Sequence, residues 1–471
     1  MTTSPSKDSP ATPASLPKDA LPVRGILSIP TALTRSPLIL IGLSVLLWIG
    51  ALLSLPAWDK SIRGLLHSNT YSDVARQWYC CLYVRNGVDP FDAANSALER
   101  TYGAVQGPNR IRLKDVRIWS VNTTQYDDQT PGLLPGTPPP EAGYPPSSLA
   151  ICLALFGYIP FPWLTPFWAL LNLACFLGLI WFLSFPTARS SWQHSCYSLL
   201  MCAGCFLIWP TTRLIFAHGQ FTFFSMLFAL LGLHYRLTRP WLASILFSLA
   251  LIKPALVLLF LIIPLLERNW RFLLGISIFH GLATLVIAGM IHVTPWKMLQ
   301  DWMNICRYLL QGSYTFQEIY NALGWENTWI ATTLTLVIFA YSTLVCWLSR
   351  AQRSTLLLTF LCFFNLMWTY HERHDFTLLV LPLMLGVVQG WTSPSAGLTY
   401  VRQGFWVLLF VLIGIGLSTP AYANLLPISH LLRWLGRIGI WSALIWINVE
   451  FWMNWVQSNA LHKPLLDRRP I

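Results

Sequence analysis

The stretch Tyr71-Ser-Asp-Val-Ala-Arg-Gln-Trp-Tyr79 follows the first long apolar segment of the chain, Leu38 to Pro56. A membrane helix needs about 17–25 apolar residues, so we expect the stretch to begin at a membrane surface. It contains Asp73, and a carboxylate at such a surface can accept a proton from an alcohol. Asp73 is also in place for a helix N-cap, because Asp is favoured there and Val-Ala-Arg-Gln-Trp can open a helix.

The composition identifies the class of protein. Only 11% of the 471 residues are charged, the mean hydropathy is +0.52, and the apolar runs are long and repeated. A soluble chain carries about 25% charged residues. We therefore predict an all-α polytopic membrane protein, and the 24 Trp residues suit its two membrane interfaces.

The formal net charge of +12 does not indicate nucleic-acid binding. Much of it lies in short tails and turns between apolar runs, where Lys and Arg mark cytoplasmic sides of a membrane. The expected partners are therefore anions close to the chain, either phosphates of membrane lipids or a phosphorylated substrate.

The ten cysteines indicate no metal or redox centre. Most lie inside apolar runs and are expected to be small buried residues. Cys202 and Cys205 form a C-x-x-C, but it lies in an apolar segment without a second pair. Cys80 and Cys81 are adjacent and are not expected to pair with each other, so we predict no obligatory disulfide.

The chain divides at changes in composition. Residues 1–36 are rich in Ser, Thr, Pro and Lys, which predicts a disordered cytoplasmic tail. We predict a first transmembrane helix over 37–56, an extracytoplasmic loop with amphipathic interfacial helices over 57–147, and a transmembrane bundle over 148–457. A cytoplasmic tail, 458–471, follows. The loop holds nine of the nineteen acidic residues, and a loop of this length is expected to have a function.

The bundle is predicted to bring the total to about 11–13 transmembrane helices, without internal repeats. Its apolar segments are 148–160, 163–184, 195–217, 220–236, 240–264, 272–293, 328–349, 354–369, 376–391, 404–420 and 435–457. One topology makes the basic turns near Arg236 and Arg268 cytoplasmic. It requires the 240–264 segment to dip and return, and it places the 294–327 loop outside. Whether 148–160 crosses fully is left open.

Charges within membrane segments are costly and mark candidate sites. Lys253 lies inside an apolar segment and is followed by Pro254, which frees backbone groups locally. It either belongs to a site or extends to an interface. Arg213 and His218 frame a short stretch that ends in Gly219-Gln220.

The cluster His371-Glu372-Arg373-His374-Asp375 follows Trp368 and precedes another apolar run. It resembles the zinc motif H-E-x-x-H only superficially, because its second His is at i+3 rather than i+4. A solvated turn between helices is one interpretation. Imidazole and guanidinium groups together also suit a phosphate leaving group.

These features together resemble the GT-C superfamily of glycosyltransferases that use lipid-phosphate sugars, and within it family 87. The family pattern of an Asp followed by an aromatic, a Gly and a Pro-aromatic resembles Asp73, Trp78 or Tyr79, Gly87 and Pro90-Phe91. Its other landmarks also occur here, and in the same order. They are Tyr144-Pro145-Pro146, Gly219-Gln220, Lys253-Pro254 and Trp368 with His371-Glu372-Arg373.

The resemblance implies a GT-C-like bundle and inverting glycosyl transfer without a cofactor or an obligatory metal. The donor would be a polyprenyl-phosphate sugar, mannose-like or pentose, and the acceptor an extracytoplasmic glycolipid or glycan at the plasma membrane. Asp73 would be the general base. The expected donor-phosphate contacts are Arg213, Lys253, His371, Arg373 and His374. The expected substrate contacts are Tyr144, His218, Gln220, Glu372 and Trp368.

Two other functions remain open at this stage. A transporter or flippase of a lipid-linked anion would need polar groups near the bilayer midplane and usually repeated halves. A non-catalytic partner subunit would lack a connection between Asp73 and a lipid-sized groove. The stretch between Phe91 and Tyr144 is longer and more polar than the family pattern, so it predicts nothing about acceptor recognition.

Overall fold

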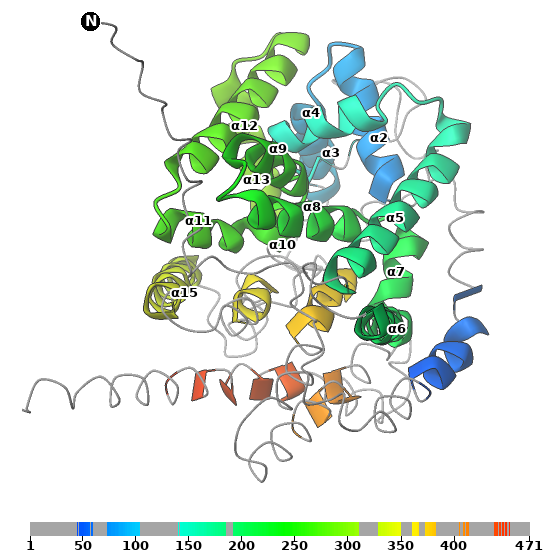
Figure 1. Ribbon diagram of the computed structural model, residues 1–471. Coiled ribbons are helices and arrows are strands. Elements are labelled where there is room, and N and C mark those ends of the chain that lie inside the picture. The colour runs from blue at the N-terminus through cyan, green and yellow to red at the C-terminus, as the bar shows by residue number, and fades with distance from the viewer. Residues whose placement is uncertain are drawn as a thin grey trace, which may run out of the picture.

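The computed structural model describes residues 47–56, 58–59, 73–103, 142–184, 192–309, 328–349, 360–366 and 373–382, with residues 45 and 140 and scattered residues within 405–413 and 438–452. All regular structure in these residues is helical (Figure 1). The elements are α2 (Asp73–Arg85), α3 (Pro90–Gly103), α4 (Pro146–Leu155), α5 (Phe161–Ser184), α6 (Trp192–Ile208), α7 (Pro210–His218), α8 (Thr222–Tyr235), α9 (Pro240–Ala250), α10 (Pro254–Val257), η4 (Leu258–Leu261), α11 (Ile262–Leu266), α12 (Trp270–Met290), α13 (Pro295–Leu309), α15 (Thr328–Ser349) and η6 (Arg373–Leu379).

Proline divides this chain into short helices. It is the first residue of α3, α4, α7, α9, α10 and α13. The first helical position tolerates proline because its N–H group would have no partner inside the helix and because its φ angle is already helical. The same ring prevents the preceding helix from continuing, so apolar sequence is folded as several short pieces.

Two described helices are long and apolar enough to cross a membrane, namely α5 and α12. Their 24 and 21 residues correspond to about 36 and 32 Å, against a hydrocarbon core of about 30 Å. Leu274, Ile278, Leu282 and Leu285 form an exposed apolar stripe along α12, as expected for a face in contact with lipid. The helical membrane class is thus confirmed, whereas the predicted count of 11–13 also involves segments outside the described residues.

The predicted apolar segment over 195–217 is sharply bent in the structure. The chain breaks at Trp209, and Leu199–Ile208 and Pro210–His218 meet at 73°. Pro210 removes a backbone donor and clashes with a continuing helix, which explains a bend at this position. The apolar composition on both sides hides this break in the sequence.

Helices α8 and α9 form an antiparallel pair at the centre of the molecule (Figure 1). Gly232 on α8 lacks a side chain where Phe247 and Ala243 of α9 approach, and a Cβ there would lie 2.9 Å from that of Phe247. After α9 the chain turns at Leu251–Lys253 and returns through α10, η4 and α11. This path agrees with the predicted dip and return of 240–264.

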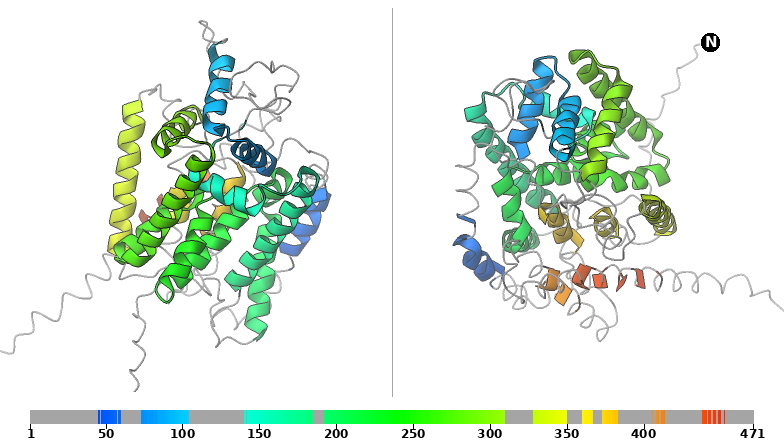
Figure 2. Two further views of the ribbon diagram at one scale, coloured as in Figure 1. Left: turned by 90° about the horizontal axis from the view of Figure 1, so that it is seen from above. Right: turned by 180° about the vertical axis from the view of Figure 1, so that it is seen from behind.

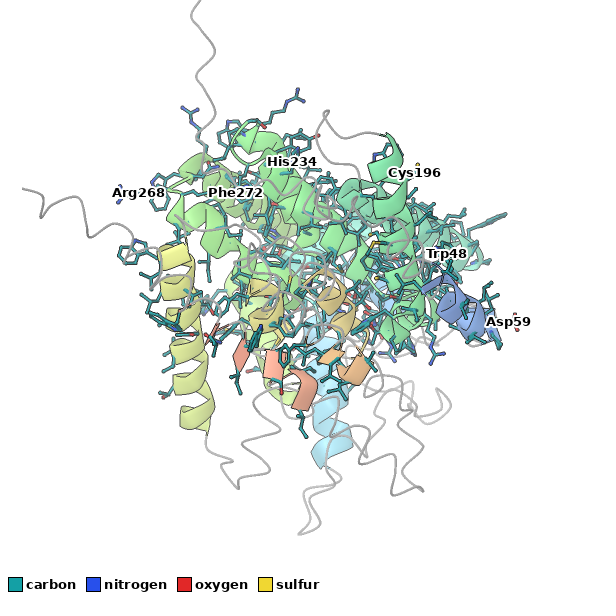
Figure 3. The ribbon with its side chains drawn as sticks, turned by 60° about the horizontal axis from the view of Figure 1, so that its bottom comes forward. Trp48, Asp59, Cys196, His234, Arg268 and Phe272 are labelled. Atoms are coloured by element: carbon teal, nitrogen blue, oxygen red, sulfur yellow. The ribbon has the colours of Figure 1, made fainter. Side chains whose placement is uncertain are left out.

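At the far end of α8, the buried guanidinium of Arg236 pairs with the partly exposed carboxylate of Glu267. Arg236 is 1% exposed and donates to both carboxylate oxygens of Glu267, at 2.7 and 2.5 Å. A third guanidinium bond goes to the carbonyl of Leu233. Arg236, which the sequence assigns to a basic turn, thus joins that turn to a second one through its guanidinium bonds to Glu267. His234 and Arg268, which flank these turns, lie in the same part of the molecule (Figure 3).

The described part of the first polar segment includes helices α2 and α3, which are joined by Asn86-Gly-Val-Asp89. Gly87 has φ +71°, and the N–H groups of Gly87 and Val88 donate to the carbonyls of Val84 and Tyr83. This pattern is a Schellman C-cap, which favours glycine. Asp89 then caps α3, since its Oδ1 accepts from the N–H groups of Phe91 and Asp92 at 2.8 and 3.3 Å.

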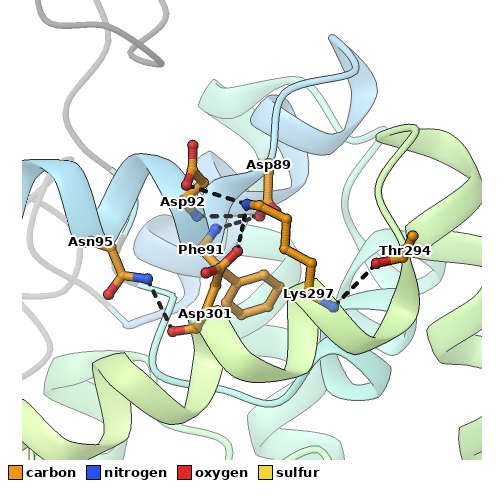
Figure 4. Close-up of polar contacts among 7 residues, drawn as sticks. All are labelled: Asp89, Phe91, Asp92, Asn95, Thr294, Lys297 and Asp301. Carbon is orange, nitrogen blue, oxygen red and sulfur yellow. Dashed lines mark hydrogen bonds and ion pairs between the residues drawn. The ribbon is translucent and has the colours of Figure 1, made fainter.

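Helix α13 packs beside α3 and was not anticipated by the assignment of 294–327 as a loop (Figure 2). Asn95 donates to the carbonyl of Asp301 at 3.1 Å, and Lys297 lies 2.8 Å from Asp301 and 3.4 Å from Asp92 (Figure 4). Trp302 donates to the carbonyl of Gly143. Thus α13 holds both the first polar segment and the entry to α4.

We predict that Arg236→Lys lowers the free energy of unfolding by about 2 kcal/mol, because an ammonium cannot form the two parallel bonds to Glu267. Thermal unfolding in detergent, followed by Trp fluorescence, measures the change. Arg239→Lys is the matched control, because Arg239 lies in the same turn but is exposed. Equal unfolding temperatures for the two variants would show that the bidentate geometry contributes nothing.

A second prediction concerns Asp89. Burial raises the pKa of its carboxyl above the ordinary value, although the N–H groups of Phe91 and Asp92 oppose this shift. The folded state then holds the proton more tightly than the unfolded state, so stability falls as the pH rises through the window above the ordinary carboxyl pKa. At pH 7 we expect Asp89→Asn to be neutral or stabilising, because Asn keeps the cap.

The comparison for that prediction is Asp89→Ala, which removes the cap and should cost about 1 kcal/mol. Unfolding temperatures of both variants at pH 7 and pH 4.5 test the point. A decrease in unfolding temperature for Asp89→Asn as large as the decrease for Asp89→Ala would contradict the prediction.

Candidate functional site

The Gly219-Gln220 pair terminates α7 and enters the interior. Gly219 has φ +60°, and the N–H groups of Gly219 and Gln220 donate to the carbonyls of Phe216 and Ile215. This is a second Schellman cap, in which glycine is favoured because an L side chain is strained at that φ. The cap directs Gln220 inward, where it is fully buried.

Helix α5 holds the backbone of this turn. The indole N–H of Trp168 donates to the carbonyl of Gly219 at 2.8 Å, and the amide of Asn172 donates to the carbonyl of Gln220 at 3.0 Å. Trp168 and Asn172 are four residues apart and therefore lie on one face of α5. Two carbonyls that the cap leaves without partners are satisfied in this way, which fixes the turn in place.

Lys253 lies at the break between α9 and α10. Its φ and ψ of −122° and 76° are those of an extended residue before proline, and Pro254 begins the next helix. The side chain is buried, and its ammonium donates to Gln220 Oε1 at 3.0 Å and to Asp375 Oδ1 at 2.5 Å. The Lys253 ammonium is therefore bonded inside the protein, and the side chain does not extend to a membrane interface.

Asp375 is 2% exposed and lies in η6. Its Oδ1 also accepts from the hydroxyl of Thr222 at 3.1 Å. Element η6 packs along α7, where the hydroxyls of Thr211 and Thr377 lie 2.6 Å apart. The interpretation of 371–375 as a solvated turn is thus wrong at Asp375. We call Gln220, Thr222, Lys253 and Asp375 the buried polar network.

The network joins three parts of the chain that are remote in sequence. Lys253 is 33 residues from Gln220 and 122 residues from Asp375. Isolated charges are too costly to bury, so the ammonium and the carboxylate stabilise each other, and the neutral amide and hydroxyl complete their hydrogen bonds. The network is therefore an ion pair with no net charge, to which one amide and one hydroxyl are hydrogen-bonded.

Asp73 lies in the first turn of α2, 17% exposed, with Arg76 at 3.4 Å. Helix α4 packs against α2 and also approaches the network. Ser148 of α4 donates to the carbonyl of Leu251, two residues before Lys253, at 3.0 Å. Tyr144, which precedes α4, packs edge-on against Phe221 with ring centroids 5.5 Å apart. Helix α4 therefore contacts both helix α2 and the segment that leads to Lys253.

Of the other predicted site residues, two lie on α7 and differ in exposure, and the rest lie outside the described residues or have no described side chain. Arg213 is half-buried on α7, with no carboxylate in ion-pair range among the described residues, and His218 is exposed at the end of the same helix. Trp368, His371 and Glu372 lie outside the described residues, as do the side chains of Arg373 and His374.

The described residues contain no group of three or more His, Cys, Asp or Glu side chains that could hold a metal ion. The cysteines among them, including Cys80, Cys81, Cys202 and Cys205, form no disulfide bond.

Sequence reasoning assigned no separate role to Asp375, Thr222 or Asn172. Asp375 was noticed as part of a polar cluster, and a carboxylate that enters an apolar run signals a buried partner of opposite charge. Thr222 and Asn172 give no such signal, because single hydroxyl and amide groups are common in helices.

We predict that Asp375→Leu lowers the free energy of unfolding by about 3–5 kcal/mol, because it leaves the Lys253 ammonium buried without its counter-charge. The double variant Lys253→Met, Asp375→Leu should recover most of this loss, since both charges are then absent. Thermal unfolding in detergent measures both. A double variant less stable than the single one would contradict the pairing.

Comparison with known families supports a common origin for the part of the chain that builds this site. A family model described as Glycosyltransferase family 87 matches residues 143–382, a little more than half of the chain. The match includes Tyr144-Pro145-Pro146 and the whole buried polar network, and Asp73 precedes it. No curated protein and no solved structure matches the chain. The match over most of the bundle shows that this chain belongs to glycosyltransferase family 87.

Proposed function

We propose that this protein transfers a glycosyl residue from a polyprenyl-phosphate sugar, mannose-like or pentose, to an extracytoplasmic glycolipid or glycan. Family membership supports glycosyl transfer, and the apolar helices α5 and α12 suit an enzyme that takes a donor from the lipid phase. The proposed location is the plasma membrane, with several crossings and an extracytoplasmic active site.

The observation that carries the proposal is the convergence of three motifs at one buried site. Gly219-Gln220, Lys253-Pro254 and the end of the 371–375 cluster are distant in sequence, yet Lys253 bonds to both Gln220 and Asp375. Polar groups are expensive in a membrane bundle and gather where a substrate needs them. Helix α4 extends the site toward α2, which begins with Asp73.

The donor phosphate is proposed to lie against Arg213 and the basic residues of 371–374, with Lys253 behind them. A guanidinium binds phosphate oxygens in pairs, and Arg213 has no competing carboxylate among the described residues. Tyr144 and His218 lie on the two sides of the Gly219-Gln220 turn and are proposed to contact substrate.

Asp73 is proposed as the general base. Its carboxylate takes the proton of the acceptor hydroxyl while the oxygen attacks C1 of the sugar from the face opposite the phosphate. The bond from C1 to the phosphate oxygen breaks, polyprenyl phosphate leaves as an anion held by the cations, and the configuration at C1 inverts. Positioned proton removal contributes about 10²–10⁴-fold, and alignment of the two substrates adds to it.

The purified protein should be incubated with several polyprenyl-phosphate sugars and native lipid extracts, and the products identified by mass spectrometry. We predict that Asp73→Asn reduces transfer about a hundredfold or more, because the amide cannot accept the proton. Donor binding should be unchanged, since the base contacts only the acceptor.

The matched control is Asp92→Asn, which removes an exposed carboxylate from the neighbouring helix α3. It should retain wild-type transfer and membrane expression. Wild-type activity in Asp73→Asn would remove Asp73 from the role of base, and no transfer by the wild-type protein from any polyprenyl-phosphate sugar would overturn the proposed function.

A further inference from the structure

The amide of Gln220 is held in one orientation. Its Oε1 accepts from the Lys253 ammonium at 3.0 Å, and α5 and the Schellman cap fix its backbone. A flipped amide would place its NH₂ group against the ammonium, which has only donors. Lys253 therefore determines which way the NH₂ group of Gln220 points.

That NH₂ group is buried and has no acceptor among the described residues. A buried donor without a partner is costly, and folded proteins contain few of them. The hydroxyls of Thr212 on α7 and Ser225 on α8, which flank the Gly219-Gln220 turn, are likewise buried without a partner in the described part of the chain. Of these groups, the Gln220 NH₂ is the one whose direction is fixed by a charged neighbour, so it is a donor prepared for a polar ligand.

We propose that Gln220 Nε2 donates a hydrogen bond to an oxygen of the donor head group, and that Lys253 and Asp375 are positioning residues for it. This inference rests on the proposed function. The acceptor atom is a sugar hydroxyl or a phosphate oxygen, because both accept from a neutral amide.

The charge balance supports a positioning role for Lys253. Asp375 lies 2.5 Å from the ammonium and neutralises it, so the pair attracts an added anion less than a lone cation does. The same pair is well suited to hold an amide, because the Asp375 carboxylate fixes the ammonium, which in turn fixes Oε1. In this proposal the guanidinium of Arg213 forms the ion pair with the donor phosphate.

The test measures binding of polyprenyl phosphate and of polyprenyl-phosphate mannose to the purified protein, together with the donor KM and kcat. Gln220→Met removes the donor at similar length and should weaken donor binding about tenfold or more, with a smaller change in kcat. Gln220→Glu is the second variant. It keeps the oxygen for Lys253 but has no NH₂ group, and it should weaken donor binding at least as much.

The two lipids separate the two acceptor atoms. Weaker binding of both lipids assigns the contact to a phosphate oxygen, and weaker binding of the mannose lipid alone assigns it to a sugar hydroxyl. Unchanged binding of both lipids by folded Gln220→Met and Gln220→Glu overturns the inference while leaving the proposed function intact. Failure of the wild-type protein to bind either lipid overturns both.

The positioning role is tested by combining substitutions. Asp375→Asn should raise the donor KM, and adding Gln220→Met should raise it little further, because both act on one contact. Independent, multiplying effects on KM would overturn the positioning role. Ser342→Ala is the matched control, because it removes another buried hydroxyl without a described partner and should leave the donor KM unchanged.

Discussion

The ion pair between Lys253 and Asp375 is the interaction on which the centre of this structure depends. In an apolar bundle neither charge is stable alone, so the two segments that carry them must meet. Lys253 reaches this position because α9 ends before Pro254, and Asp375 reaches it because η6 lies along α7. Gln220 and Thr222 complete the contacts from the start of α8. The polar network therefore depends on the helix breaks, because they bring its charged residues together.

A second ion pair, between the buried guanidinium of Arg236 and the carboxylate of Glu267, lies at the opposite end of α8. The fourteen residues of α8 separate the two pairs by about 21 Å, and its packing against α9 between them is apolar. Apolar packing is non-directional and tolerates small shifts along a helix axis, whereas a charge pair requires particular atoms to meet. The two pairs thus set the register of α8 with the chain that returns through α10 and α11.

Several motif residues have a structural role that local sequence explains. Gly87 and Gly219 occupy left-handed positions at helix ends, and Asp89 caps α3 ahead of Pro90. Helix α13 could also have been found, because Thr294 and Pro295 mark its start and Met298, Trp302 and Ile305 recur at helical spacing. The bend at Pro210 was missed because apolar residues continue on both sides of it. Such local signals are readable from sequence once proline is given more weight than hydropathy.

The sequence by itself determined the membrane class, the interruption at Lys253-Pro254, the presence of helices in the first polar segment and the order of the family landmarks, because each depends on residues close together in the chain. Only the tertiary structure decided the partners of the charges. It showed that Asp375 neutralises Lys253, that Gln220 shares the same ammonium and that Arg236 is buried against Glu267. Local patterns cannot supply these partners. The energy of a buried charge depends on which group lies within a few ångströms of it, and that group can be far away in the sequence.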